Sequence, residues 1–214
     1  MMKPYELIIF DFDGTLVDTL EDIAYYANQV LGAFGLAQQP VLEVKKAIGS
    51  GVHDLLRALA PSLSSDPPNL EKAVNLFKAR YRAKPVIRTD VFQDVRAMLE
   101  GPLSNLKKAI VTNKPQDITE QILKELKIGH YFEMTIGIDA GFLPKPDAAA
   151  TQHVISSLGF SPKQCVFVGD SSVDAFTAKN AGVDFAWVSY GYDNLREIKP
   201  LLIFSSPAEW RSLA

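Results

Sequence analysis

Cysteine and histidine are scarce in this chain of 214 residues, which has one cysteine and three histidines. One cysteine excludes a disulfide within the chain, and so few residues of the two types cannot build a zinc cluster by themselves. Cys165 lies in an apolar segment at residues 164–168, where we expect a small buried residue of a strand. The composition therefore fits a reducing, cytoplasmic setting.

The chain also lacks a strong net charge, a low-complexity tract, an internal repeat and any long apolar run. Its formal net charge is −3, which gives no electrostatic reason to expect nucleic acid or an anionic membrane as a partner. No apolar stretch approaches the length that spans a bilayer, and the run at residues 7–10 is too short for the core of a signal peptide. We expect a cytoplasmic protein without membrane or nucleic-acid partners, either a monomer or a homodimer.

The first part of the chain joins one strand pattern to a long helical segment. Residues 7–10 form a continuous apolar run, which predicts a central strand buried on both faces. Residues 18–84 show helical patterns and no strand pattern. An all-helical segment of this size directly after a first strand is typical of an inserted domain.

Beyond residue 84, strand and helix patterns alternate. The first of these helices is expected at residues 90–101, capped by Thr89 or Asp90. Such alternation predicts an α/β fold, a doubly wound parallel sheet with a Rossmann-like core. We expect this core to comprise residues 1–17 and 85–214 and to carry an inserted helical cap domain of residues 18–84.

Three of the predicted strands end in polar side chains. In an open parallel sheet, ligands bind beyond the carboxyl ends of the strands, so we expect these side chains to meet in one crevice, with Lys145 joining from the loop before its helix. Carboxylates gathered in this way repel one another unless a cation lies among them, and oxygen ligands without clustered histidine or cysteine favour Mg²⁺. The polar residues at the three strand ends are Asp11, Asp13, Thr112, Asn113, Asp170 and Asp174.

These residue types suit phosphoryl transfer. A carboxylate such as Asp11 beside Mg²⁺ can attack phosphorus and form an acyl phosphate. A second carboxyl such as Asp13 can protonate the leaving oxygen and later activate water, while Gly14 permits an unusual backbone close to a ligand. Thr112 and Asn113 supply a hydroxyl and an amide that are suited to phosphoryl oxygens.

Each segment taken alone also has a purely structural interpretation. Residues 11–15 could be a polar turn that caps a helix, and residues 112–113 could cap the helix after them. Lys145 alone would be a solvated surface charge, and Asp170 and Asp174 a helix cap and an exposed helix residue. The functional interpretation depends on finding all of them together.

Taken in order, the segments resemble the four motifs of the haloacid dehalogenase superfamily, over residues 8–192. The resemblance implies that Asp11 is the nucleophile and Asp13 the general acid/base, and that Thr112 and Lys145 hold the transferring phosphoryl group.

The same resemblance implies a magnesium site. Mg²⁺ would be held by Asp11, by the backbone carbonyl of Asp13 and by Asp170, and Asp174 would orient these ligands or bind through water. The helical segment at residues 18–84 looks like the helical cap of this superfamily.

Within the superfamily, three segments resemble phosphoglycolate phosphatases: residues 48–52, residues 111–114 and residues 189–192. This narrower resemblance implies Mg²⁺-dependent hydrolysis of a small phosphorylated metabolite, and it implies that Gly49, Ser50 and Gly51 belong to a cap loop facing the active site. His53 and Arg57 of the cap could read a substrate carboxylate; equally, they could be ordinary polar residues of a cap helix. Gly14, Thr112, Asn113 and Lys145 complete the expected phosphate-binding and substrate-binding set.

Other functions are open to the same scaffold. A phosphomutase or a pyrophosphatase of this fold would share the motifs, and a binding protein on an inactive scaffold would lack at least one catalytic group. A dehalogenase needs no metal and would not be expected to carry both Asp13 and Asp170. A phosphonate hydrolase needs a cap lysine such as Lys45 or Lys46, but Asp13 argues for ester hydrolysis.

The sequence departs from the family pattern at two places. Ala148 follows Asp147 where a proline is usual, which should affect only the start of a helix. Residues 88–91 stand where the family often has Pro-Gly, so the second linker between cap and core could turn differently.

Overall fold

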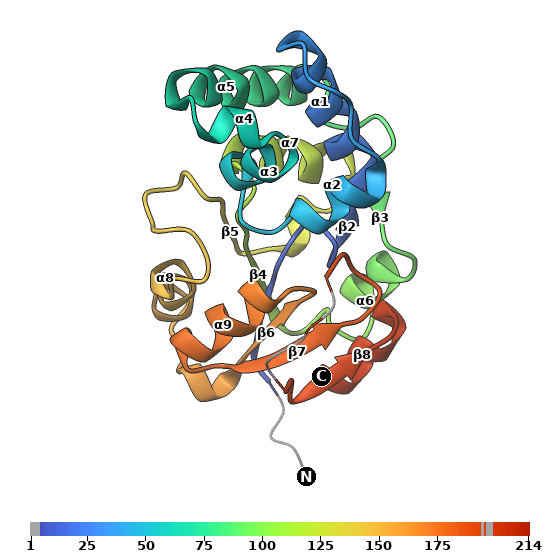
Figure 1. Ribbon diagram of the computed structural model, residues 1–214. Helices are drawn as coiled ribbons and strands as arrows, with labels where there is room; N and C mark the ends of the chain where they lie inside the picture. The colour runs from blue at the N-terminus through green and yellow to red at the C-terminus, as the bar shows by residue number, and fades with distance from the viewer. Residues whose placement is uncertain (1–4, 194, 196–198) are drawn as a thin grey trace.

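The structure is a computed structural model that describes residues 5–193, 195 and 199–214. Its centre is a six-stranded sheet of order β5-β4-β1-β6-β7-β8, in which all neighbouring strands are parallel (Figure 1). This confirms the predicted doubly wound parallel sheet. The strands of this sheet are β1 (Leu7–Phe10), β4 (Lys107–Val111), β5 (Met134–Ile136), β6 (Cys165–Gly169), β7 (Asp184–Val188) and β8 (Leu202–Phe204).

The central strands are apolar because helices cover both faces of the sheet. Ile8 and Phe10 of β1 belong to one buried cluster, and Leu7 and Ile9 belong to a second cluster on the other face. Cys165 of β6 is fully buried in the second cluster, as expected for a small core residue. Side chains that alternate between two apolar layers explain why these strands read as continuous apolar runs.

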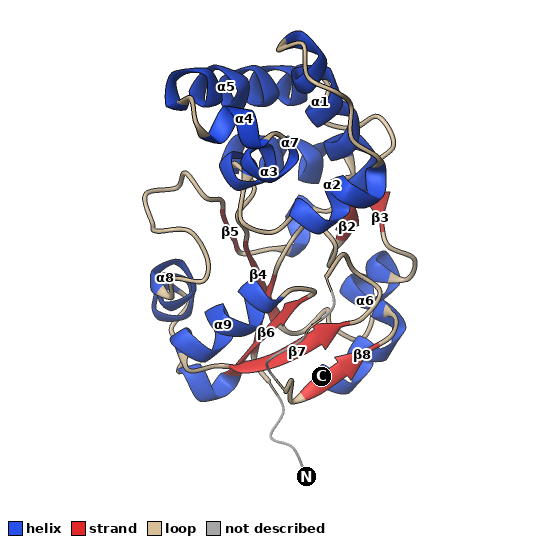
Figure 2. Cartoon of the chain, viewed as in Figure 1, coloured by secondary structure: helices blue, strands red, loops and turns tan. Residues whose placement is uncertain are grey.

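Each face is covered by its own set of helices (Figure 2). The first cluster takes in side chains of α6 (Val95–Glu100), α7 (Gln116–Glu125) and the 3-10 helix η3 (Pro207–Leu213). The second cluster takes in side chains of α8 (Ala149–Ser157) and α9 (Ser172–Ala181). Two further 3-10 turns, η1 (Gly129–Tyr131) and η2 (Pro162–Gln164), lie in the connections.

Five helices between the first and third strands of the chain lie together at one end of the sheet (Figure 1). We call this group the cap. The cap consists of α1 (Leu20–Ala33), α2 (Val41–Ala47), α3 (Val52–Leu59), α4 (Pro61–Ser64) and α5 (Pro67–Ala83). The division of the chain into two domains at residues 17/18 and 84/85 stays a prediction.

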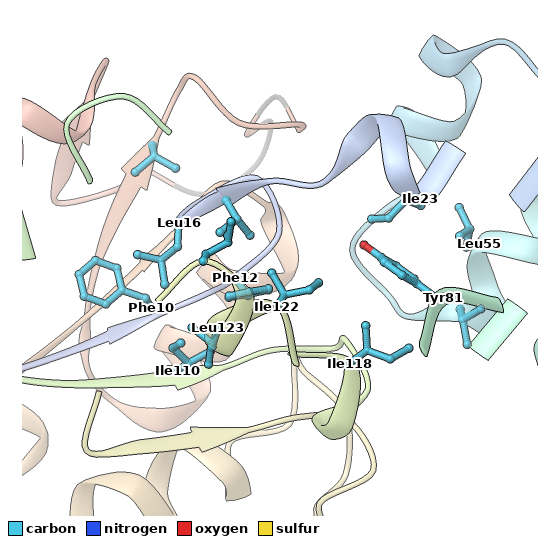
Figure 3. Close-up of a cluster of buried hydrophobic side chains, with 14 of the residues drawn as sticks. Phe10, Phe12, Leu16, Ile23, Leu55, Tyr81, Ile110, Ile118, Ile122 and Leu123 are labelled. Atoms are coloured by element: carbon cyan, nitrogen blue, oxygen red, sulfur yellow. The ribbon is translucent and has the colours of Figure 1, made fainter. Parts of the chain in front are cut away.

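A shared apolar cluster joins the cap to the core (Figure 3). Phe10 and Phe12 lie on the core side of this cluster, and Ile23, Leu55 and Tyr81 lie on the cap side. The cap therefore packs on the core through buried apolar contacts, and burial of this apolar surface favours the packed arrangement over its exposure to water.

The predicted helix at residues 90–101 is shorter than expected. Residues Asp90–Val91 form β3, which pairs antiparallel with β2 (Val17–Asp18), and helix α6 begins only at Val95. Neither Thr89 nor Asp90 is its cap, because the residue before the helix is Asp94. The Thr89 hydroxyl instead donates to Asp22 Oδ2 at 2.7 Å. The second linker is therefore drawn towards α1 before the chain re-enters the core.

Within the described residues, none of the helices combines the length and the apolar composition that crossing a bilayer requires.

Candidate active site

A cleft of about 670 Å³, counting its open mouth, lies between the cap and the carboxyl ends of β1, β4 and β6. The core contributes polar side chains to its wall, and the cap contributes mainly apolar ones. Its core wall includes Asp11, Asp13, Thr112, Asn113, Lys114 and Asp170, and its cap wall includes Ile23, Ile48, Gly49, Gly51, Val52, Leu55, Phe77 and Tyr81. The parallel sheet thus brings the predicted strand-end residues to one place.

Asp11 and Lys145 form a buried ion pair at the bottom of this region. Lys145 Nζ lies 2.8 Å from Asp11 Oδ1 and 2.6 Å from Asp174 Oδ1. Only 6 % of Lys145 is exposed, so the structure contradicts the alternative interpretation of a solvated surface charge. Asp174 is held in turn by the Ser171 backbone N–H and hydroxyl, at 3.0 and 2.6 Å.

Asp170 joins Asp11 and Asp174 in a cluster of three carboxylates. One oxygen each of Asp11, Asp170 and Asp174 lies within 4.8 Å of the others, and all three residues are buried. Two glycines make room for them: a Cβ on Gly191 would lie 2.3 Å from the Asp170 Cβ, and a Cβ on Gly14 would lie 2.5 Å from Asp170 Oδ2. Gly14 has φ +79°, the left-handed backbone expected from the sequence.

Burial and mutual repulsion disfavour the charged forms of these carboxylates. Burial raises the pKa of Asp11 to about 7, the charge of Asp174 adds to this effect, and Lys145 opposes it. Burial also raises the pKa of Asp170 well above its usual range, and the charges of Asp174 and Asp11 contribute. Burial opposes the charged form of Lys145, but Asp11 and Asp174 outweigh it and raise the Lys145 pKa.

The charge and the donor atoms of this cluster fit a divalent cation. Three carboxylates and one ammonium group leave a net negative charge in a buried site. All three are hard oxygen ligands, and the described residues of the cluster include no histidine or cysteine.

Asp13 lies at the mouth of the cleft, where its carboxylate has partners from two directions. The Thr19 hydroxyl donates to Asp13 Oδ1 at 2.7 Å, and Lys114 Nζ lies 3.0 and 3.2 Å from the two carboxylate oxygens. Lys114 also donates to the Tyr81 hydroxyl at 3.0 Å. The sequence alone predicts no role for Lys114 or Tyr81, although a lysine directly after Thr112-Asn113 is a charge at a strand end.

Thr112 and Asn113 both line the cleft, and the Thr112 hydroxyl accepts from the Lys114 N–H at 3.3 Å. Asn113 Nδ2 donates to the carbonyl oxygens of Gly49 and Lys145, each at 3.0 Å, and Asn113 Oδ1 accepts from the Lys145 N–H at 2.8 Å. Both amide hydrogens are therefore used within the protein. The Asn113 side chain connects the cap loop to the lysine loop, so its amide does not face phosphoryl oxygens as the sequence suggested.

The cap loop reaches the cleft, whereas two other predicted cap residues do not. Gly49 and Gly51 line the cleft. His53 faces Glu71 at 3.0 Å, and Arg57 donates to Asp54 at 2.9 Å on the exposed side of α3.

The reason is the amphipathic pattern of α3. Val52 and Leu55, three residues apart, share the face that lines the cleft. His53 and Arg57, four residues apart, share another face, and neither is among the residues that line the cleft. Ser50 is exposed and is also absent from that wall.

Tyr192 connects the carboxylate cluster to the start of the cap. Its backbone N–H donates to Asp170 Oδ2 at 2.6 Å. Its hydroxyl accepts from the Thr19 N–H at 2.6 Å and donates to Asp18 Oδ1 at 2.8 Å. Burial raises the pKa of the Tyr192 phenol, with the Asp13 charge contributing, so the hydroxyl keeps its proton for this bond.

Comparison with known proteins places this geometry in a family. Residues 8–188 match the family described as haloacid dehalogenase-like hydrolase. Phosphoglycolate phosphatase 1 of Pseudomonas aeruginosa is 37% identical over 197 residues, which cover 90% of this chain and 72% of that protein. Phosphoglycolate phosphatase of Nitrosococcus oceani is 31% identical over 220 residues, which cover 100% of this chain and 98% of that protein.

A solved structure shows the same arrangement of the whole chain. The crystal structure of a predicted phosphoglycolate phosphatase from Haemophilus somnus 129pt superimposes with a TM-score of 0.90 at 29% sequence identity, covering 100% of this chain and 99% of that one. The family match, the relatives and the strand-end carboxylates agree, and the chain belongs to the haloacid dehalogenase-like hydrolase family.

Proposed function

We propose that this hydrolase is a Mg²⁺-dependent phosphatase that cleaves a small phosphate monoester through an aspartyl-phosphate on Asp11, with 2-phosphoglycolate as its substrate. The observation that carries the proposal is the buried cluster in which Asp11 lies 2.8 Å from Lys145 and within 4.8 Å of two further carboxylates. The names of the relatives support phosphoglycolate as the substrate.

Asp11 is the nucleophile in this proposal. Its carboxylate oxygen forms a bond to phosphorus while the ester P–O bond breaks, and the electron pair of that bond goes to the leaving oxygen. Asp13 gives its proton to this oxygen, so that an alcohol leaves. Lys145 offsets negative charge on the phosphoryl oxygens, and the Thr112 hydroxyl donates to one of them.

The second step regenerates the enzyme. Asp13, now a carboxylate, takes a proton from water as the water oxygen bonds to phosphorus. The bond between phosphorus and the Asp11 oxygen breaks, which releases inorganic phosphate and restores Asp11. The apolar cap wall at Val52, Leu55 and Phe77 limits the access of other water molecules.

Asp11 and Asp170 would hold Mg²⁺ together with the Asp13 backbone carbonyl, and Asp174 would orient these ligands. When bound, the cation neutralises charge on the phosphoryl group and on the carboxylates around it. The location in the cytoplasm, the monomeric or homodimeric state and the lack of nucleic-acid and membrane partners stay predictions from composition.

The test is phosphate release from a panel of compounds, with Mg²⁺ and with a chelator. The panel contains 2-phosphoglycolate, p-nitrophenyl phosphate, pyrophosphate and a sugar phosphate. We expect Mg²⁺-dependent release from 2-phosphoglycolate above the others, and no release by the Asp11→Asn variant. Preferred cleavage of pyrophosphate would show instead that the protein is a pyrophosphatase. An isomerised sugar phosphate without phosphate release would show that it is a phosphomutase.

A further inference from the structure

Lys114 is buried beside Asp13, and all three of its ammonium hydrogens have an acceptor. Lys114 Nζ donates to both carboxylate oxygens of Asp13, at 3.0 and 3.2 Å, and to the Tyr81 hydroxyl at 3.0 Å. Only 6 % of Lys114 is exposed. An ammonium group has three donors, so this lysine has none left for a substrate group unless one of these contacts breaks.

Tyr81 brings the cap into this arrangement. It lies on the last turns of α5, is 1 % exposed, and stacks on Tyr26 of α1 at a centroid distance of 4.9 Å. Figure 3 shows its ring among cap side chains, with Ile23 and Leu55 nearby. Burial raises the Tyr81 pKa well above its usual range, so the neutral phenol can accept from an ammonium group. Lys114 also lies over the Tyr81 ring, 4.4 Å from its centroid.

A second contact fixes Asp13 from the other linker of the cap. Thr19 immediately precedes α1, and its hydroxyl donates to Asp13 Oδ1 at 2.7 Å. Asp13 is thus held between Thr19 at the start of the cap and Lys114, which is itself held by Tyr81 near the end of the cap. The Thr19–Asp13 bond and the Lys114–Tyr81 bond each join the cap to the core.

We propose that Lys114, held by Tyr81, is a positioning residue. It keeps the Asp13 carboxyl group within hydrogen-bond distance of the leaving-group oxygen when the cap is closed. This inference rests on the proposed phosphatase function. After Asp13 has given its proton to the leaving oxygen, the remaining carboxylate is the form that Lys114 holds, and in that place it takes the proton of the attacking water. A displacement of about 1 Å from such a place can cost about 100-fold in rate.

The experiment separates this role from general support of the fold. Wild type, Lys114→Met and Tyr81→Phe are compared by kcat/KM for propyl phosphate, 2-phosphoglycolate and 2,4-dinitrophenyl phosphate. The kcat/KM value covers the steps up to departure of the alcohol, so it is independent of the later hydrolysis of the aspartyl-phosphate. Lys107→Met is the matched control, since Lys107 stands at the other end of β4 in an exposed pair with Glu133.

The expected result depends on the leaving group. Propanol leaves only with a proton, whereas dinitrophenolate leaves without one. Lys114→Met should therefore lower kcat/KM for propyl phosphate about 100-fold and for 2,4-dinitrophenyl phosphate less than about 5-fold. Tyr81→Phe keeps the ring and loses only the hydroxyl, so it should show the same pattern with a loss of about 10-fold for propyl phosphate. This variant also supplies the test if Lys114→Met does not fold.

Three results would overturn the inference. Equal losses for the propyl and dinitrophenyl esters would mean that Lys114 supports the site without acting on proton transfer. A loss for 2-phosphoglycolate with none for propyl phosphate would make Lys114 the receptor of the substrate carboxylate. Normal activity of both variants on all esters would show that the contacts of Lys114 with Asp13 and Tyr81 do not contribute to catalysis. Failure of the wild type on all three esters would instead reject the proposed phosphatase.

Discussion

Asn113 holds both backbone polar atoms of Lys145, accepting from its N–H at 2.8 Å and donating to its carbonyl at 3.0 Å. The same side chain donates to Gly49 of the cap loop at 3.0 Å. A residue that the sequence assigned to the substrate therefore fixes the loop that carries Lys145.

The first prediction is that Asn113→Ala lowers kcat about 100-fold with a much smaller change in Mg²⁺ affinity. Without the side chain, the lysine loop loses its backbone partners, and a misplacement of about 1 Å is enough for a loss of this size. Steady-state kinetics and a Mg²⁺ titration measure both quantities. Asn105→Ala, at an exposed position beside β4, is the control. A kcat within 2-fold of wild type for Asn113→Ala would contradict the role of Asn113 in holding the loop of Lys145.

The second prediction concerns the cation. Asp170→Ala should raise the Mg²⁺ concentration needed for half-maximal activity by about 10-fold or more, because it removes one of the three clustered carboxylates. Asp54→Ala removes an exposed carboxylate that pairs with Arg57 and should leave the requirement unchanged. An unchanged Mg²⁺ requirement in Asp170→Ala would remove this residue from the cation site.

The third prediction is a pH dependence of the stabilisation by Mg²⁺. The folded pKa of Asp11 is about 7 against an ordinary value of 3.8, so between these values the folded chain binds more protons than the unfolded chain. Stability of the metal-free protein should therefore fall as pH rises from about 4 to about 7. A cation that offsets the repulsion should raise Tm more at pH 8 than at pH 5.

Thermal unfolding with Mg²⁺ and with a chelator at both pH values measures this difference. Asp11→Asn is the control, since it keeps the volume of the side chain and removes its titration. Equal Mg²⁺-induced shifts in Tm at pH 5 and pH 8 in the wild type would contradict the prediction.

The fourth prediction concerns the second linker. Asp22 accepts from the backbone N–H groups of Ile87, Arg88 and Thr89 and from the Thr89 hydroxyl, at 2.7 to 3.0 Å for the shortest bond to each. Asp22→Ala should lower the free energy of unfolding by about 3 kcal/mol, since three backbone N–H groups and the Thr89 hydroxyl lose a buried, charged acceptor. Urea unfolding measures this loss, and Glu21→Ala, whose exposed side chain pairs with Arg88, should change it by less than about 0.5 kcal/mol.

The fifth prediction concerns His53 and Arg57. Both lie outside the cleft wall, so His53→Ala and Arg57→Ala should each leave KM for 2-phosphoglycolate within about 2-fold of wild type. A rise of about 10-fold in KM in either variant would return that residue to the substrate site, as the sequence had suggested.

The sheet was predictable because each central strand is apolar on two faces. Residues 7–10 read as one apolar run since Ile8 and Phe10 enter one layer while Leu7 and Ile9 enter the other. The start of α6 was not predictable in this way. Thr89 and Asp90 are good caps by composition, but the distant Asp22 binds Thr89 and β2 pairs with Asp90–Val91.

The strand-end carboxylates were predictable for a similar reason, since topology alone brings Asp11 and Asp170 to the same edge of the sheet. The contacts of Lys114 with Tyr81 were not, because 33 positions separate the two residues and no periodic pattern links a cap helix to the loop after β4. Pairings between the cap and the core are decided by packing, which residue types do not reveal.

The Tyr192 backbone N–H donates to Asp170, and the Tyr192 hydroxyl accepts from the Thr19 N–H. An interaction that fixes the Asp170 carboxylate therefore also fixes the start of the cap at Thr19, through Tyr192. Thermodynamic linkage makes the effect mutual: if cation binding favours closure of the cap by some factor, closure must tighten the cation by the same factor.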